Sequence, residues 1–256
     1  MKRKNVSRYP FFHVPHDGED FPPDLMGSVC VPETDFLFYH GQMRDLYAGL
    51  LIPDPYGNES YACTFPVSRL LCDVERLIGP DEVMERLGMG FCYERVYDGT
   101  VIKRVTERLK AETQKYYDAH HRRMNGLCER HDRILLFDLH SYHDVIIPQD
   151  RILNGKPLPD LCLGVDVSHT PSALVECAYD RFRKAGLTVE VDYPYSGCYI
   201  PECLWQEGGV CGCDLAGVML EFHRRAYLDA AGKPDFRKIG LIRDTIRLIM
   251  DDCSSC

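Results

Sequence analysis

The stretch RILLFDL, from Arg133 to Leu139, is an apolar run too short for a helix, and His140 follows it directly. A run of this kind fits a strand that is buried on both faces of a sheet. The aromatic and β-branched segment YPFFHV, Tyr9 to Val14, predicts a first strand, and Leu215 to Phe222 predicts a late one. Polar residues follow all three segments, so these strands organise the rest of the sequence.

Helical patterns alternate with the strands along the chain. The longest lies between Thr100 and Arg130, where apolar residues recur near a 3.6-residue period. Shorter helices are predicted over Asp35–Leu46 with Thr34 as N-cap, Thr170–Ala185 with Gly186 as its stop, and Phe236–Asp252. Short strands are predicted within Gly49–Ile52, Tyr61–Phe65, Pro157–Val165 and Thr188–Asp192.

This alternation predicts a three-layer α/β/α fold with a central mixed, mostly parallel sheet and helices on both faces. The chain has 256 residues, of which 45% are hydrophobic, and we expect a single domain spanning residues 1–256. In such sheets the functional site lies beyond the carboxyl ends of the strands. The polar residues that follow the strands are therefore the first candidates for chemistry.

Composition excludes several classes of function. A net charge of -9 argues against a nucleic-acid partner, which would favour a basic face. No apolar run approaches the ~20 residues that cross a bilayer, so we expect no membrane partner. The basic start Met1–Lys4 is not followed by an apolar region, which predicts no secretory signal. The 13 cysteines then indicate reduced thiols and a cytoplasmic protein.

Two close cysteine pairs stand apart from the other cysteines: Cys211-x-Cys213 and Cys253-x-x-Cys256. A structural zinc site needs four ligands, which two such pairs could supply together. A redox pair is the alternative interpretation. The second pair ends the sequence given, where chain ends commonly fray, so the pattern alone gives the pairs no defined role.

Three predicted strand ends carry groups typical of a metal hydrolase. They are His16-x-x-Glu19, Asp138-x-His140-Ser141 and Glu221-x-His223. Catalytic zinc takes three protein ligands, commonly two His and one carboxylate, and keeps one position for water. His16, Glu19 and His140 meet that count, and Zn²⁺ would activate the water. Glu221 fits the general base that takes the proton of this water.

The order of these motifs resembles the zinc carboxypeptidase and aspartoacylase superfamily, and within it the N-formylglutamate amidohydrolase family. The matching residues are short motifs spread over most of the chain: Val14-Pro15-His16-Asp17-Gly18, Thr34-Asp35, Ser68-Arg69, Asp73-x-x-Arg76, Asp138-x-His140-Ser141, Pro159–Gly164, Pro194–Gly197, and Glu221 with Arg224. The resemblance implies a zinc amidohydrolase that releases an acyl group, such as formate, from a small acidic N-acyl amino acid.

The resemblance also implies roles for two arginines. Arg69 would stabilise the oxyanion, and Arg76 would hold a substrate carboxylate, because a guanidinium stays charged and pairs bidentately with carboxylates. The alternative is that both arginines pair with Asp73 and Glu75 on a helix surface. Ser141 and Tyr199 are further candidates for substrate contact.

The sequence departs from the family pattern at two positions. Glu75 stands where the family usually has Asn before the second Arg, and a carboxylate there would repel an acidic substrate unless it turned away. An acidic residue after Thr34, here Asp35, is common in the family, whereas the family often lacks a Glu at position 19. Asp35 therefore competes with Glu19 for the third metal position, and spacing favours Glu19.

Three other functions compete with the amidohydrolase hypothesis. A zinc peptidase or a cell-wall amidase would use the same water on a different substrate. A non-catalytic metal-binding homologue would have lost the chemistry, which intact Glu221 and Arg69 argue against. A cysteine nucleophile needs a neighbouring His, and the sequence marks none. The oligomeric state is not indicated.

Overall fold

The computed structural model describes residues 7–147, 151–153, 155–205 and 211–254. The chain forms two compact units. The first combines residues up to Val14 with Tyr47–Cys63 and the chain from Met124 onward; the second combines Pro15–Leu46 with Thr64–Arg123. The prediction of one domain over the whole chain stays a prediction, and each unit is described by itself.

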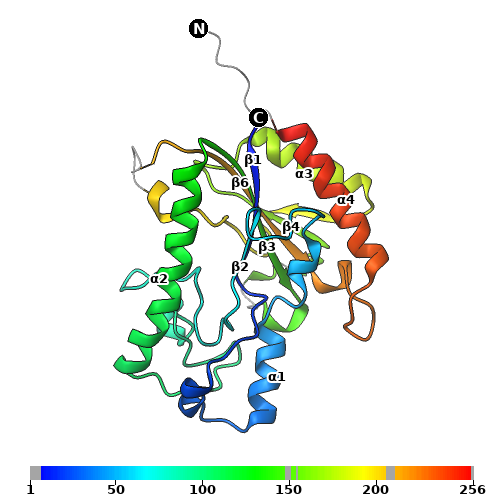
Figure 1. Cartoon of the computed structure of the whole chain (residues 1–256). Helices are drawn as coiled ribbons and strands as arrows, with labels where there is room; N and C mark the ends of the chain where they lie inside the picture. The colour runs from blue at the N-terminus through cyan, green and yellow to red at the C-terminus, as the bar shows by residue number, and fades with distance from the viewer. Residues whose placement is uncertain (1–6, 148–150, 154, 206–210, 255–256) are drawn as a thin grey trace. The chain divides into compact units, whose positions relative to one another are not determined.

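A six-stranded sheet dominates the first unit, in the order β2-β1-β3-β6-β4-β5 (Figure 1). The bounds of its strands are β1 (Tyr9–Val14), β2 (Ala62–Thr64), β3 (Arg133–Tyr142), β4 (Leu161–Gly164), β5 (Val189–Val191) and β6 (Asp214–His223). Strand β3 is parallel to both β1 and β6, and β5 is parallel to β4. Strand β4 is antiparallel to β6. The sheet is thus mixed and mostly parallel, as predicted.

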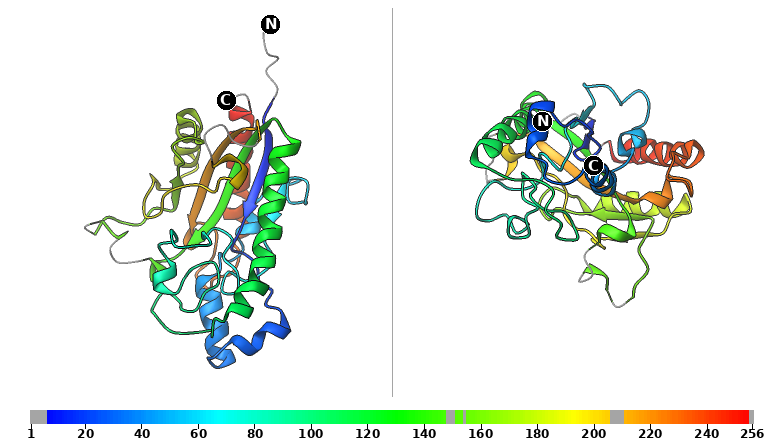
Figure 2. Two further views of the ribbon diagram at one scale, coloured as in Figure 1. Left: turned by 90° about the vertical axis from the view of Figure 1, so that its left-hand side faces the viewer. Right: turned by 90° about the horizontal axis from the view of Figure 1, so that it is seen from below.

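Both faces of the sheet are covered in the first unit, which gives the three predicted layers. Helices α3 (Ser172–Lys184) and α4 (Phe236–Cys253) pack together on one face, seen as the yellow-green and red helices of Figure 2. That face presents Phe12, Phe137 and Leu220. The opposite face presents Phe11, Leu136 and Leu215 to the last turns of α2 (Glu107–Arg130). Successive side chains of a strand point to opposite faces, so the two cores alternate along each strand.

The second unit holds α1 (Glu33–Met43) and the beginning of α2, with turns and 3-10 segments between them. Its core contains Phe65, Leu71, Phe91 and Tyr117. Further 3-10 segments of the chain are η1 (Pro23–Ser28), η2 (Ala48–Leu51), η3 (Glu85–Leu87), η4 (Asp144–Ile146), η6 (Glu202–Leu204) and η7 (Arg224–Ala226). Across the described ranges, no helix combines the length and the apolar character that crossing a bilayer requires.

Two predicted helix starts are wrong. Helix α1 begins at Glu33 with Pro32 as its N-cap, because the N–H groups of Asp35 and Phe36 close the first turn on the Pro32 carbonyl; Thr34 lies inside the helix. The long helix begins at Glu107 rather than Thr100. Thr106 sets this start as an N-terminal cap, since its hydroxyl accepts the N–H of Leu109.

Two predicted strands also differ from the structure. The segment predicted as a strand at Gly49–Ile52 is the 3-10 helix η2, which follows Tyr47 in the left-handed region at φ 62°. The central strand does not end at Leu139. It continues to Tyr142, because β6 pairs with it as far as the register pair Tyr142–His223. His140 and Ser141 therefore lie within a strand rather than after one.

Candidate active site

One group of polar residues lies on a single face of the sheet in the first unit: His13, Asp138, His140 and Glu221, here called the sheet cluster. Strand register brings them together, since His13 is the partner of Asp138 and His140 is the partner of Glu221. Register partners lie side by side on the same face, about 4.8 Å apart at the backbone. All four are buried, with Glu221 7% exposed. Their opposite-face neighbours, such as Leu139 and Leu220, anchor the strands in the core beneath α3 and α4.

Asp138 is the centre of the sheet cluster. Its Oδ1 lies 2.8 Å from His13 Nδ1 and 3.1 Å from His140 Nε2, and its Oδ2 accepts the backbone N–H of Tyr199 at 2.9 Å. Burial raises the pKa of this carboxyl, but the charges and hydrogen bonds of His140 and His13 outweigh burial and hold the pKa below its usual range. An ionised carboxylate accepts only, so each imidazole donates the N–H that faces Asp138.

The Glu221 carboxylate influences its neighbours on the same face. Burial, followed by the negative charge of Glu221, raises the pKa of Tyr142. Burial also raises the pKa of Cys162 to about 12, with a further contribution from Glu221, which is its register partner. Both residues are therefore uncharged at neutral pH, and among these three groups the carboxylate is the one suited to accept a proton.

A second group of polar residues lies in the second unit: His16, Asp45, Arg69, Asp73 and Tyr93, here called the Asp73 cluster. Asp73 Oδ1 lies 3.0 Å from His16 Nε2, and its Oδ2 accepts hydrogen bonds from Arg69 Nη2 and the Tyr93 hydroxyl, both at 2.8 Å. Asp45 lies on the other side of the imidazole, with Oδ2 3.6 Å from His16 Nδ1. A buried carboxylate thus holds His16 as Asp138 holds His140.

Close backbone packing joins the two chain segments that carry His16 and Asp73. Residue Asp20 forms a parallel bridge with Val67, and its N–H donates to the Pro66 carbonyl. A Cβ on Gly18 would stand 2.5 Å from the carbonyl oxygen of Phe65, so glycine is required for this approach. Next to Arg69 in the chain, the carbonyl of Leu70 accepts a hydrogen bond from the buried ammonium of Lys103 at 2.6 Å.

Electrostatics in the Asp73 cluster favour ionised groups. Burial raises the pKa of Asp73, but the charges of His16 and Arg69 outweigh it, and the pKa lies well below the usual range. Burial and Arg69 lower the pKa of His16, and Asp73 and Asp45 reverse this to give a raised pKa. Burial likewise opposes the charge of Arg69, whereas Tyr93 and Asp73 hold its pKa above the usual value.

The predicted carboxylate ligands have surroundings different from those of Asp45. Glu19 has a side chain that is 67% exposed, and it forms an ion pair with Arg44. Asp35 is exposed in the first turn of α1. Asp45, which the sequence did not single out, is 3% exposed and faces His16. No local pattern marks Asp45, because it follows the end of α1 and its contacts are with residues distant in the chain.

The two predicted arginines are not on a helix surface. Residues 68–77 form turns, and Asp73 between them is fully buried. Arg69 is held by Asp73 and Tyr93, whereas Arg76 is more open, with 29% exposure and Nε 3.7 Å from Asp73 Oδ2. Glu75 turns toward the same cluster, since its Oε2 lies 3.6 Å from His16 Nε2.

The two candidate substrate contacts of the first unit lie differently. Tyr199 joins the sheet cluster through its N–H bond to Asp138, and its ring centroid lies 4.2 Å from that of His13. Ser141 lies next to His140 in β3, so its side chain points to the opposite face, where its hydroxyl has no hydrogen-bond partner among the described residues. A substrate role for Ser141 stays a prediction.

The cysteine pairs are arranged differently from the sequence expectation. Cys211 and Cys213 lie near Cys128 and Cys203. Cys253 lies at the end of α4 and hydrogen-bonds with Cys177, and Cys256 lies outside the described residues. Sequence spacing could not indicate this grouping, because Cys128 and Cys203 are 75 positions apart in the chain.

Comparison with known proteins identifies the family. The sequence matches the family described as N-formylglutamate amidohydrolase over residues 10–228, a range that includes both polar clusters. The chain belongs to this family. This N-formylglutamate amidohydrolase family member is therefore an amidohydrolase-type enzyme, which acts on a carbon–nitrogen bond of a small molecule.

Solved structures share the fold of this amidohydrolase. An N-formylglutamate amidohydrolase from Ralstonia eutropha JMP134 superposes with a TM-score of 0.74 at 20% identity, covering 97% of this chain and 94% of that one. The gene product Atu2144 from Agrobacterium tumefaciens superposes with a TM-score of 0.64 at 17% identity, covering 98% and 92%. No curated protein matches the sequence. At these identities the structural likeness supports the three-layer fold alone.

Proposed function

We propose that this amidohydrolase hydrolyses the amide bond of a small N-acyl amino acid of the N-formylglutamate type, and that it uses a Zn²⁺ ion bound by His16 and His140. The observation that carries the proposal is the hydrogen-bond partner of each of these two imidazoles. In each, Nε2 faces a buried carboxylate, Asp73 for His16 and Asp138 for His140. Zinc-binding histidines commonly have this carboxylate partner, which fixes the ring and the tautomer.

The donor chemistry fits zinc. Imidazole nitrogens and one carboxylate are the usual protein ligands of a hydrolytic zinc site. For the carboxylate we propose Asp45, because it is buried beside His16 Nδ1, whereas Glu19 is exposed and paired with Arg44. Glu19 and Asp35 remain the sequence-based alternatives. When bound, the ion would activate a water molecule and polarise the substrate carbonyl.

Glu221 is the proposed general base. Its carboxylate oxygen would take a proton from the attacking water and then deliver that proton to the nitrogen of the leaving amine. Two features suit it to this role. It is the register partner of His140, and it is buried on a strand whose alternate residues are packed in the core, which fixes its position.

The arginines have separate proposed roles. Arg69 would stabilise the oxyanion, because hydrogen bonds to Asp73 and Tyr93 hold the guanidinium rigidly and it needs no rearrangement. Arg76 would hold a substrate carboxylate, since it is more exposed than Arg69. Tyr199, whose N–H donates to Asp138, is the residue of the first unit that we propose contacts the substrate. Glu75, close to His16, would weaken the preference for acidic substrates that Arg76 provides.

Two measurements on the full chain test the proposal. Release of a primary amine from N-formyl-L-glutamate and from a series of neutral and acidic N-acyl amino acids identifies the substrate class. Zinc content is measured alongside for wild type, His140→Ala and the control His169→Ala, which removes another imidazole paired with a carboxylate. We expect loss of one zinc ion per chain and of activity in His140→Ala alone.

Other results would assign other functions. Turnover of peptides or cell-wall fragments without turnover of N-acyl amino acids would indicate a peptidase or amidase on the same fold. A zinc content that falls in His140→Ala, with no hydrolysis of any substrate by wild type, would indicate an inactive homologue. Unchanged zinc content in His140→Ala would refute the metal site.

A further inference from the structure

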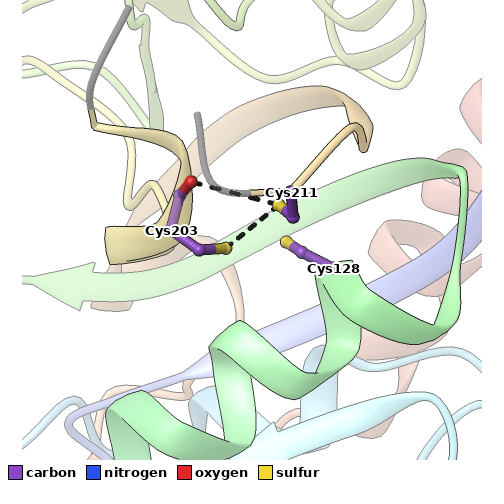
Figure 3. Close-up of side chains that lie close together, drawn as sticks. All are labelled: Cys128, Cys203 and Cys211. Carbon is purple, nitrogen blue, oxygen red and sulfur yellow. Dashed lines mark hydrogen bonds between the residues drawn. The ribbon is translucent and has the colours of Figure 1, made fainter. Parts of the chain in front are cut away.

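Four cysteines of the first unit, which the proposed mechanism does not use, gather near the end of α2. They are Cys128, Cys203, Cys211 and Cys213, here called the thiol cluster. Figure 3 shows the first three side chains pointing toward one another from α2, from η6 and from the chain before β6. The sulfur atoms of Cys128, Cys203 and Cys211 lie within 4.8 Å of one another, and Cys203 and Cys211 Sγ are 3.3 Å apart.

Cys213 is the fourth member of the thiol cluster. It hydrogen-bonds with Cys128, and this bond lowers the pKa of Cys213 while it raises that of Cys128. Burial and the Asp214 carboxylate oppose this and raise the pKa of Cys213, and the Arg8 guanidinium, which donates to Asp214 at 2.9 Å, lowers it by a smaller amount. Burial and the neighbouring Cys211 raise the pKa of Cys203 to about 12. The four thiols therefore act on one another electrostatically and share one small region.

The spacing of the sulfur atoms matches a metal site better than a simple thiol pair. Tetrahedral zinc with four sulfur ligands at about 2.3 Å holds these atoms about 3.8 Å apart. Among Cys128, Cys203 and Cys211, the closest sulfur pair at 3.3 Å and the upper limit of 4.8 Å lie on either side of this value. A disulfide would use two thiols and leave the convergence of the others unexplained. We propose that the thiol cluster binds a structural Zn²⁺ ion.

The surrounding structure prepares the cluster for an ion. The backbone N–H of Cys203 donates to Asn125 Oδ1 at 3.2 Å, which ties η6 to α2 one turn before Cys128. Cys128 itself is buried among Met124 and Leu127, so the helix end is rigidly packed. On the other side, Cys213 directly precedes β6, the strand that carries Glu221. The ion would thus link the end of α2 to the start of β6.

Zinc counting on the full chain, purified under reducing conditions, tests this proposal. The variants are Cys203→Ser and Cys211→Ser, and the matched control is Cys177→Ser, a half-buried thiol that pairs with Asp252. We expect each cluster variant to carry one zinc ion per chain fewer than wild type, and the control to equal wild type. This difference does not depend on substrate or activity, so it stands or falls separately from the proposed function.

Two further measurements protect the test from misfolded variants, because both use wild-type protein. Capping thiols with an organic mercurial should release one zinc ion per chain, detected with a chromogenic chelator, since His and carboxylate ligands do not react. Replacing zinc with Co²⁺ should give a thiolate-to-cobalt charge-transfer band. Equal zinc in all variants, or no zinc release on capping, would each overturn the proposal.

Discussion

Replacing Asp138 with Asn tests whether one ionised carboxylate holds the sheet cluster together. The substitution keeps the shape of the side chain and removes its charge and one of its two acceptor oxygens. Asp138 is buried and has three donors around it: His13 and His140 on Oδ1, and the N–H of Tyr199 on Oδ2. An amide cannot accept from all three, so at least one donor loses its partner.

The expected loss of stability follows from these contacts. In the best arrangement the amide oxygen takes the Oδ1 position and keeps both imidazoles, and the amide NH₂ then faces the Tyr199 N–H, donor against donor. Leaving that buried donor unsatisfied costs about 1–3 kcal/mol, and loss of the charge weakens each imidazole bond by about 1 kcal/mol. Together Asp138→Asn should lower the free energy of unfolding by about 3–5 kcal/mol.

Thermal melting followed by circular dichroism, with a chelator present to remove bound metal, measures this loss. For a chain of this size each kcal/mol corresponds to about 2–4 °C, so Tm should fall by about 6–20 °C. The matched control is Asp229→Asn in an exposed turn. There Oδ1 alone accepts the N–H groups of Ala231 and Lys233, and an amide oxygen keeps both bonds. Its free energy of unfolding should change by less than about 0.5 kcal/mol.

A second measurement separates positioning from stability. If Asp138 orients His140 for zinc, Asp138→Asn should weaken zinc affinity about 10–100-fold, and Asp229→Asn should leave it unchanged. A Tm for Asp138→Asn that matches the Asp229→Asn control would refute the charged, three-donor arrangement. A large Tm loss with unaltered zinc affinity would leave Asp138 a structural residue and remove its role toward the metal.

Three other predictions concern catalysis, substrate and acid stability. Glu221→Gln should keep zinc and fold yet lose roughly 10²–10⁴ in kcat, the usual worth of general acid–base catalysis; loss of zinc would instead make Glu221 a ligand. In steady-state assays with N-formyl-L-glutamate, Arg76→Ala should raise KM far more than it lowers kcat, because the contact of Arg76 with the substrate carboxylate binds ground and transition states alike. A pure kcat effect of Arg76→Ala would assign this contact to the transition state. In the same assay, Glu75→Asn should lower KM, because it removes a negative charge that repels the acidic substrate. A carboxyl with a depressed pKa stabilises the fold above about pH 4 and loses that effect as pH falls. In the presence of a chelator, the Tm of wild type should therefore drop more steeply between about pH 4 and pH 2 than the Tm of Asp73→Asn. Parallel curves of Tm against pH would contradict the depressed pKa of Asp73.

The elements that the sequence predicted well are those in which one physical signal dominates. The apolar run Arg133–Leu139 predicts most of β3, and the predicted helices Thr170–Ala185 and Phe236–Asp252 lie within two residues of the observed bounds of α3 and α4. Where local signals compete, prediction failed. The segment Thr100–Thr106 continues the apolar period of the long helix, yet tertiary pairing takes it into bridges such as Val29–Lys103, and Thr106 then caps the helix.

The candidate site was predictable only in part, for a related reason. His140 and Glu221 follow from the strands that carry them, because register makes them neighbours. Asp45, Tyr93 and the grouping of the thiol cluster follow from contacts between segments distant in the chain. Neither hydrophobic period nor short-range spacing contains that information, and a single sequence therefore does not indicate these partners.

The alternation of faces along β3 and β6 also limits how the length of this protein can change. Asp138 and His140 share one face because they are two residues apart, and Leu139 between them belongs to the opposite core. Suppose that one residue is removed or inserted upstream in β3 and the pairing to β1 and β6 is otherwise kept. Asp138 and His140 would then point into the apolar layer under α3 and α4, and leucines such as Leu139 would take their places on the opposite face. Length variation among relatives should therefore be found between the strands, and strands β1, β3 and β6 should keep a constant length.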